Sequence, residues 1–278
     1  MRVAVAGARL FVDFAGAKLR PDGPWLREVP TVVLVHTGPG TDHTPYKETI
    51  GPVLAEDAQV VYVDLRGHGR SDESTPDTWR VETWSNDLSV LFERLGVERP
   101  VVIGNGFGAL TALRFAQRWP DALSKLVLVN PVARNVVPRI VTRFDELGGA
   151  AAGEAAHAFH EHPNDVTLTH FMNTCLPVML GPAYAVPAML TPIWNLRVPV
   201  EWVREESASI DLREELGRIS AETLLVAGTD DPQYPVASIE EVIAGIPHAH
   251  VRWYQGARHS VYRDAPESIR VVQDFATR

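Results

Sequence analysis

The segment from Pro100 to Pro131 reads PVVIGNGFGALTALRFAQRWPDALSKLVLVNP, and it decides the fold. It consists of an apolar run, a glycine-rich turn, an amphipathic stretch and a second apolar run. The first run, 101–103, is β-branched and lies between Pro and Gly, which is typical of a strand covered on both faces of a parallel sheet. Apolar residues at helical spacing follow the turn, so a helix should pack back onto that sheet. The segment therefore predicts a strand, turn, helix and strand unit of an α/β protein.

The same alternation continues on both sides of this segment. The predicted strands and helices are, in chain order, strands at 31–35 and 59–63, a helix at 81–95, a strand at 222–227, a helix at 237–245, a strand at 250–254 and a helix at 265–277. At the N-terminal end, 2–14 predicts an edge hairpin and 20–30 a Pro-rich loop. This order predicts an α/β fold with a doubly wound, mostly parallel sheet.

The alternation stops between residues 133 and 217. Polar helical segments, an Ala-rich piece and an apolar stretch interrupted by prolines stand there instead. We interpret 133–217 as an inserted helical cap, or lid, and 1–132 together with 218–278 as the core domain. The apolar stretch 171–196 contains four prolines, which argue against a membrane-spanning helix because each would break the backbone hydrogen-bond ladder.

Composition excludes several classes of protein. The chain has 278 residues, 45% of them hydrophobic, which is enough for a large core. A formal net charge of −9 argues against a nucleic-acid-binding surface, which needs a basic face. The single cysteine, Cys175, excludes an internal disulfide and a thiolate metal cluster, and with no secretory signal evident it favours a cytoplasmic protein.

The glycine-rich turn carries the first functional signal. Its sequence, Gly104-Asn105-Gly106-Phe107-Gly108, resembles the nucleophile elbow of the α/β-hydrolase superfamily, whose pattern is Gly-x-Ser-x-Gly. The flanking glycines match, but Gly106 occupies the position of the nucleophilic serine. The resemblance therefore implies the fold and the site of a serine hydrolase, while the attacking hydroxyl is missing at its expected position.

A second motif follows the strand at 31–35. His36-Thr37-Gly38-Pro39-Gly40 is similar to the His-Gly-Gly-Pro-Gly loop of proline iminopeptidases, with Thr37 replacing a glycine. That resemblance implies that the amides of Gly38 and Phe107 form an oxyanion hole. It places the chain nearest to the proline iminopeptidase-like hydrolases. The alternative is that 36–40 is only a Gly/Pro turn.

Two further motifs complete the resemblance. Gly228-Thr229-Asp230-Asp231-Pro232 matches the superfamily's carboxylate position at Asp231, with Asp230 as the alternative, and His259 matches the general base. An Asp-Pro turn alone is more often structural, but the order nucleophile, acid, histidine is the one this fold uses. His36 and His68 are expected to brace loops. The resemblance implies no metal and no cofactor.

The predicted cap supplies candidates for substrate binding. The residues we expect to contact an apolar acyl group are Thr37, Phe171, Met172, Met179, Tyr184 and Trp194. The alternative is that the cap residues form the cap's own core. Glu201, Glu205 and Glu206 could hold a substrate amino group, although a solvated helix face is the simpler interpretation.

These features predict an acyl hydrolase that acts on a small ester, lactone or prolyl amide by a Ser-His-Asp mechanism. In this chain Gly106 replaces the serine. Gly106 marks either an engineered inactive variant or natural divergence, and we expect its missing side chain to leave an open space between His259 and the Gly38 and Phe107 amides. One alternative is a carbon–carbon bond hydrolase of aromatic breakdown, because Asn105 precedes the nucleophile position. Another is a non-catalytic protein that binds small molecules. A homodimer is an open option, and no membrane partner is expected.

Overall fold

The computed structural model describes residues 1–181 and 190–278. Its strands are β1 (Arg2–Val5), β2 (Ala8–Ala15), β3 (Leu19–Asp22), β4 (Trp25–Glu28), β5 (Thr31–Val35), β6 (Gln59–Val63), β7 (Val101–Asn105), β8 (Lys125–Val129), β9 (Glu222–Gly228) and β10 (His250–Tyr254). Its helices are α1 (Thr44–Lys47), α2 (Ile50–Leu54), α3 (Val81–Leu95), α4 (Phe107–Arg118), α5 (Val137–Gly148), α6 (Ala150–Glu161), α7 (Asp165–Thr174), α8 (Leu176–Leu180), α9 (Arg197–Trp202), α10 (Val236–Gly245), α11 (Val261–Asp264) and α12 (Glu267–Thr277). Short 3₁₀ turns at Pro76–Thr78 and Arg213–Arg218 and a π-helical turn at Val203–Ser207 connect them.

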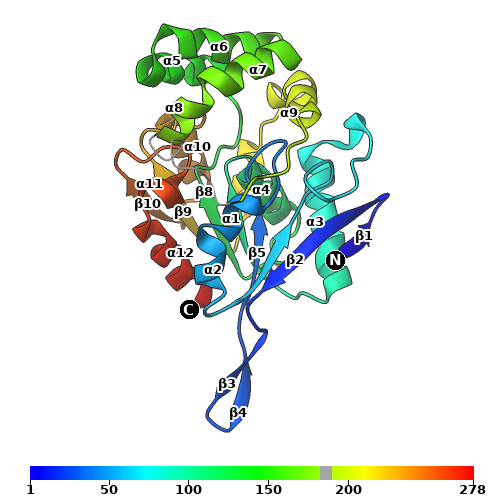
Figure 1. Cartoon of the computed structure of the whole chain (residues 1–278). Coiled ribbons are helices and arrows are strands. Elements are labelled where there is room, and N and C mark those ends of the chain that lie inside the picture. The colour runs from blue at the N-terminus through cyan, green and yellow to red at the C-terminus, as the bar shows by residue number, and fades with distance from the viewer. Residues whose placement is uncertain (182–189) are drawn as a thin grey trace.

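Eight strands form one twisted sheet in the order β1-β2-β6-β5-β7-β8-β9-β10. The pairs β1–β2 and β2–β6 are antiparallel, and all pairs from β6 to β10 are parallel. This confirms the predicted α/β fold with a mostly parallel sheet. The predicted strand–turn–helix unit is β7, Gly106 and α4, and it stands at the centre of the sheet (Figure 1).

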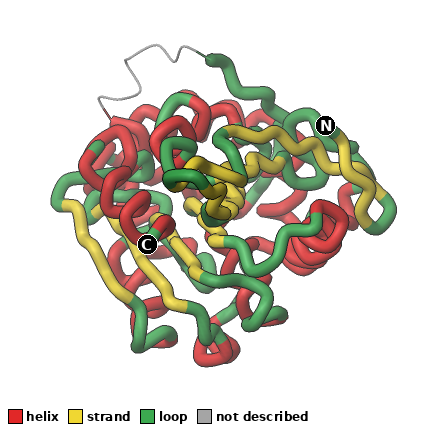
Figure 2. The backbone as a smooth tube through the Cα atoms, turned by 90° about the horizontal axis from the view of Figure 1, so that it is seen from below, coloured by secondary structure: helices red, strands yellow, loops and turns green. Residues whose placement is uncertain are grey.

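Helices cover both faces of the sheet, as the view from below shows (Figure 2). Alternate residues of each central strand point to opposite faces, so Val33 and Val102 pack with α3 and α4, whereas Leu34 and Ile103 pack with α2 and α12. Strands buried on both faces need nearly continuous apolar runs. This is why 101–103 could be recognised as a central strand from sequence.

The segment between β8 and β9 contains helices α5 to α9, and α5, α6 and α7 lie together above the sheet (Figure 1). In its described parts, 133–181 and 190–217, the only β pairing is a single bridge between Arg134 and Asp211. Arg143 of α5 donates to the carbonyl oxygen of Thr229 and to Oδ1 of Asp230, both beyond the end of β9. The helical segment is thus tied directly to the carboxyl edge of the sheet. None of the described helices has the length and apolar character needed to cross a membrane.

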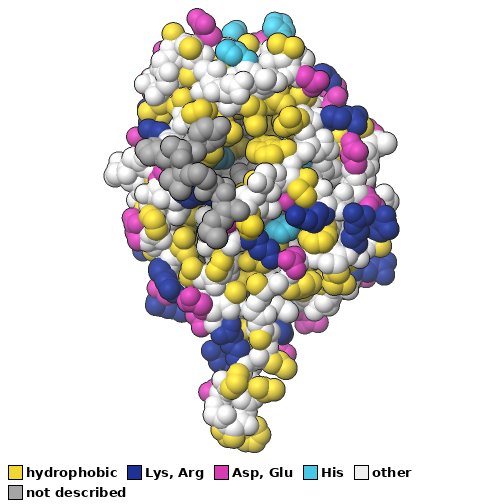
Figure 3. Space-filling model, viewed as in Figure 1, with side chains coloured by type: hydrophobic (Ala, Val, Ile, Leu, Met, Phe, Trp, Pro, Cys, Tyr) yellow, Lys and Arg dark blue, Asp and Glu magenta, His cyan; other side chains and the backbone are white. Residues whose placement is uncertain are grey.

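One local expectation was wrong. The predicted Pro-rich loop at 20–30 contains the antiparallel hairpin β3–β4, which projects away from the rest of the molecule (Figures 1 and 3). Gly23-Pro24 supplies its two-residue turn, with Gly23 at φ 59°. Both strands are mostly exposed, and Trp25 and Leu26 are 76% and 64% exposed. No buried face imposes an alternating pattern on such a hairpin, so the sequence offers little signal for it.

Candidate active site

The site forms where the parallel strands end. Thr37 lies just past β5, Gly106 follows β7, Asp231 follows β9 and His259 comes after β10. Because these strands are parallel and in register, their carboxyl ends meet at one edge of the sheet. Four residues spread over more than two hundred positions are thereby brought together.

His259 and Asp231 are in direct contact. Nδ1 of His259 lies 2.9 Å from Oδ2 of Asp231, and both residues are buried. The other carboxylate oxygen of Asp231 accepts from the backbone amides of Gln233 and Tyr234, at 2.9 and 3.1 Å. Asp230 instead pairs with Arg143, at 3.1 Å. Asp231, not the neighbouring Asp230, is therefore the carboxylate that can orient the imidazole and stabilise its charged form.

Gly106 has φ 55° and ψ −111°, a conformation that L-residues rarely adopt. A Cβ atom placed on Gly106 would lie 2.9 Å from Cε2 of Tyr234, 3.0 Å from Cε1 of His259 and 3.3 Å from its Nε2. The Cβ position of Gly106 is therefore crowded, and the space expected between His259 and the Gly38 and Phe107 amides stays a prediction. The rings of Tyr234 and His259 close around Gly106, because Tyr234 is buried and packs against the imidazole at a centroid distance of 5.4 Å.

The two expected amide donors are Phe107, which follows Gly106 directly, and Gly38, in the loop after β5. Phe107 is the first residue of α4, where a backbone N–H has no intrahelical acceptor and the helix dipole favours negative charge. A Cβ on Gly38 would lie 3.5 Å from Cδ1 of Phe107, so the loop after β5 reaches the same helix end. This arrangement can place two N–H groups next to an oxygen that gains negative charge.

A cavity of about 580 Å³ opens over these residues, and apolar side chains form most of its wall. Of the expected contacts, Thr37, Phe171, Met172, Met179 and Trp194 line it, whereas Tyr184 lies outside the described residues. Hydrophobic side chains gather on the corresponding face below helices α5 to α7 (Figure 3). The described lining contains no Asp or Glu, and its permanently charged member is Arg263, which pairs with Glu48 at 3.1 Å.

The three glutamates considered as ligands for an amino group are engaged elsewhere. Glu206 accepts from the backbone amide of Val81, at 3.0 Å, and so caps the start of α3. Glu205 lies 3.7 Å from Arg80 and Glu201 2.8 Å from Arg204. None of the three lines the described part of the cavity. The described residues therefore present no carboxylate to a substrate amino group.

Asn130, which sequence reasoning missed, positions the histidine loop. Its Nδ2 donates to the carbonyl oxygens of Arg258 and His259, at 3.2 and 3.3 Å, and its Oδ1 accepts from the amide of Gly228 at 2.8 Å. Asn130 has φ 44°, a conformation that Asn tolerates better than most residues. An Asn directly after a central strand was the available signal.

His160, in α6, also lines the cavity and was not singled out from the sequence. Neither of its ring nitrogens has a hydrogen-bond partner in the part of the chain that the structure describes. Burial lowers the pKa of His160 from its ordinary value of 6.5 to about 4. Its ring packs against Phe159 and Phe171, so a neutral imidazole stands within an otherwise apolar part of the cavity wall.

The other two motif histidines brace loops, as expected. Nε2 of His36 accepts from the amide of Leu65 at 3.1 Å, which ties the loop after β5 to the loop after β6. Nδ1 of His68 donates to the carbonyl oxygen of Arg66 at 2.9 Å, and burial lowers the pKa of His68 to about 3. No group of three or more potential metal ligands is found among the described residues.

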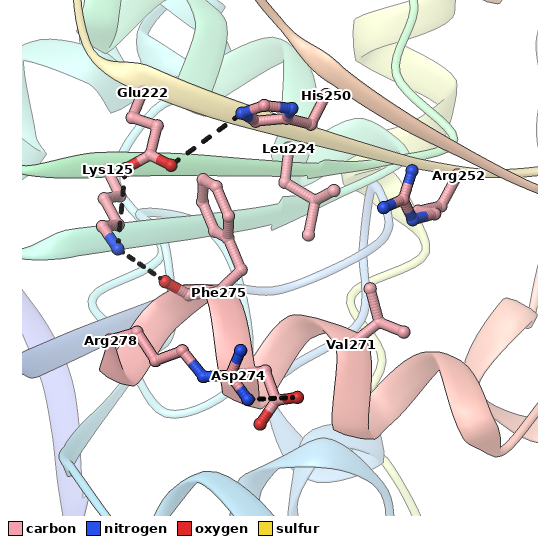
Figure 4. Close-up of a pocket in the computed structure, with 9 residues that line it drawn as sticks. All are labelled: Lys125, Glu222, Leu224, His250, Arg252, Val271, Asp274, Phe275 and Arg278. Atoms are coloured by element: carbon pink, nitrogen blue, oxygen red, sulfur yellow. Dashed lines mark hydrogen bonds and ion pairs between the residues drawn. The ribbon is translucent and has the colours of Figure 1, made fainter.

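A second pocket, of about 370 Å³, lies at the opposite edge of the sheet (Figure 4). Lys125, Glu222 and His250, the first residues of β8, β9 and β10, line it. Lys125 lies 3.6 Å from Glu222 and donates to the carbonyl oxygen of Phe275 at 2.8 Å, as the dashed lines in Figure 4 show. Lys125 pairs with Glu222 and Arg278 with Asp274, while Arg252 bonds the backbone carbonyl of Val251. The pocket lies at the strand ends remote from His259.

Residues 30–266 match the family model described as the alpha/beta hydrolase fold. The chain belongs to this family. Among curated proteins it is similar to the 2-hydroxy-6-oxo-6-phenylhexa-2,4-dienoate hydrolase of Comamonas testosteroni, at 27% identity over 88% of this chain and 86% of the relative.

Solved structures with the same fold have several activities. The enol-lactonase of Burkholderia xenovorans LB400 has a TM-score of 0.69 and 23% identity, and it covers 99% of both chains. The proline iminopeptidase of Mycobacterium smegmatis has a TM-score of 0.75 and 19% identity, over 99% of this chain and 97% of the other. Proline iminopeptidase is thus one neighbour among several kinds within the α/β-hydrolase family.

Proposed function

We propose that this protein hydrolyses a small ester or lactone with an apolar acyl part. His259 acts as the general base and Asp231 holds its tautomer and stabilises the imidazolium. The amides of Gly38 and Phe107 stabilise the oxyanion of the tetrahedral intermediate. The observation that carries the proposal is the buried contact of 2.9 Å between His259 and Asp231, with the opposite ring nitrogen beside Gly106 and Thr37.

The cavity supports the choice of substrate class. We propose that residues 133–217 act as a cap that holds the acyl part, because Phe171, Met172 and Met179 from this segment form part of the cavity wall. The described wall lacks a carboxylate for an amino group, which favours esters and lactones over prolyl amides. We expect no cofactor or metal.

A panel of p-nitrophenyl esters, lactones and prolyl amides tests this function. We expect the native chain to turn over esters or lactones, and His259→Ala to lower kcat/KM by at least about 1,000-fold, as loss of a catalytic unit does. His250→Ala is the matched control, since His250 is exposed at the far edge of the sheet. If no substrate of the panel shows turnover that is lost in His259→Ala, the alternative that the protein only binds small molecules is favoured.

A second candidate function is cleavage of a carbon–carbon bond next to a carbonyl. The curated relative named as a 2-hydroxy-6-oxo-6-phenylhexa-2,4-dienoate hydrolase favours it, together with Asn105, whose Oδ1 is buried without a partner in the described residues and whose side chain lines the cavity. Turnover of that dienoate, measured as the loss of its absorbance, distinguishes this function from ester or lactone hydrolysis. Faster turnover of esters than of the dienoate contradicts it.

A further inference from the structure

The hydroxyl group of Thr37 faces the ring nitrogen that Asp231 leaves free. Oγ1 of Thr37 lies 3.5 Å from Nε2 of His259, and both residues line the cavity. Nδ1 on the other side of the ring is engaged by Asp231. Within the described chain, Thr37 supplies the one hydroxyl within hydrogen-bond distance of Nε2. Gly106, whose Cβ position would also lie near Nε2, supplies none.

The backbone around Thr37 also suits a nucleophile. Gly38 follows Thr37 directly and lines the cavity, and a Cβ on Gly38 would lie 3.5 Å from Cδ1 of Phe107, so the two expected amide donors belong to neighbouring residues. A hydroxyl, a base that takes its proton and two donors for the developing oxyanion are the parts that acyl transfer requires. The distance of 3.5 Å is long for a hydrogen bond, but such contacts commonly shorten when a substrate fills the site.

We propose that Thr37 is the nucleophile of this hydrolase. This proposal rests on the function proposed above. Oγ1 attacks the carbonyl carbon while its proton passes to Nε2 of His259, and the electron pair of the C=O bond moves to the oxygen held by the Gly38 and Phe107 amides. The intermediate collapses, the leaving oxygen takes the proton from Nε2, and an ester on Thr37 remains. Water then attacks this ester with His259 as base and releases the acid and free Thr37.

Covalent labelling tests the nucleophile without knowledge of the substrate. An ethyl fluorophosphonate probe reacts when an activated hydroxyl attacks phosphorus, fluoride leaves and the histidine takes the proton. Mass spectrometry of the digested native chain should locate the adduct on Thr37. The adduct should be lost in Thr37→Val, which keeps the shape but removes the hydroxyl, and in His259→Ala. It should be kept in Thr37→Ser. Thr169→Val is the control, because Thr169 is exposed on α7, outside the cavity lining, with its hydroxyl bonded to the carbonyl oxygen of Asp165.

Turnover separates this proposal from the proposed function. We expect Thr37→Val to lower ester turnover by at least about 100-fold and Thr37→Ser to stay within about tenfold of the native chain. Turnover that survives Thr37→Val but not His259→Ala would show that water attacks directly, which overturns Thr37 as nucleophile and leaves the hydrolase function standing. An adduct on Ser260, which also lines the cavity, or no adduct on Thr37, also overturns it. Thermal unfolding of each variant identifies any that fail to fold.

Discussion

Asn130 donates through Nδ2 to the carbonyl oxygen of His259, at 3.3 Å, while its Oδ1 accepts from the amide of Gly228. One side chain thus joins the end of β8, the end of β9 and the histidine loop. The position of His259 depends on this link, because the loop reaches the site only after β10, which is the edge strand of the sheet.

Asn130→Ala should therefore destabilise the protein. The buried amide of Gly228 would lose its acceptor, which costs about 1–3 kcal/mol. Urea unfolding of Asn130→Ala against Asn173→Ala, an exposed Asn in α7, measures this effect. We expect Asn173→Ala to stay within about 0.5 kcal/mol of the native chain. Equal unfolding midpoints for the two variants would contradict the assigned role.

Asp231→Asn should lower turnover by about 10⁴-fold, because an amide cannot stabilise the imidazolium and favours the wrong tautomer. The Asn side chain can still accept from the amides of Gln233 and Tyr234, so the fold should survive. Asp230→Asn is the matched control on the neighbouring residue and should change turnover less than about tenfold, since Asp230 faces Arg143. The initial rate on the best ester of the panel measures both. A larger loss of turnover for Asp230→Asn than for Asp231→Asn would show that Asp230 is the carboxylate that acts on His259.

Gly106→Ser should destabilise the chain by about 1–3 kcal/mol, because a side chain at φ 55° is strained and meets Tyr234. Tyr234→Leu removes the ring atom that would lie 2.9 Å from the new Cβ, so Gly106→Ser should cost less in that background. A double-mutant cycle by chemical denaturation measures the coupling, which we expect to be at least about 0.5 kcal/mol. Additive effects would show that Tyr234 does not restrict position 106.

His160 should make the protein less stable in acid. Its pKa is about 4 in the folded chain and near 6.5 when unfolded, so the unfolded state binds more protons between these pH values. Stability should then fall as the pH drops from 6.5 to 4, and His160 accounts for up to about 3 kcal/mol of the loss. His160→Phe should flatten this part of the stability curve, measured by urea unfolding across the pH range. His157→Phe, an exposed position of the same helix, should leave the slope unchanged.

Much of the fold and part of the site could be predicted from sequence. The helix over Val81–Leu95 and the central strands were recognised because burial imposes a period of 3.6 on a covered helix and a continuous apolar run on a strand with two covered faces. The candidate residues at 106, 231 and 259 came from motifs at strand ends. The hairpin β3–β4 was missed because exposed strands carry no such pattern.

The sequence by itself determined the order of the parallel strands and of the helices between them, the elbow with glycine at its centre, and the carboxylate and histidine after the late strands. Only the tertiary structure decided that Asp231 faces the imidazole, that Tyr234 crowds the Cβ position of Gly106 and that the Thr37 hydroxyl lies next to Nε2 of His259. The physical reason is the separation along the chain of the residues that interact. Local periodicity follows from which face of an element is buried, whereas these contacts join residues far apart in the chain and depend on how packed side chains share one cavity.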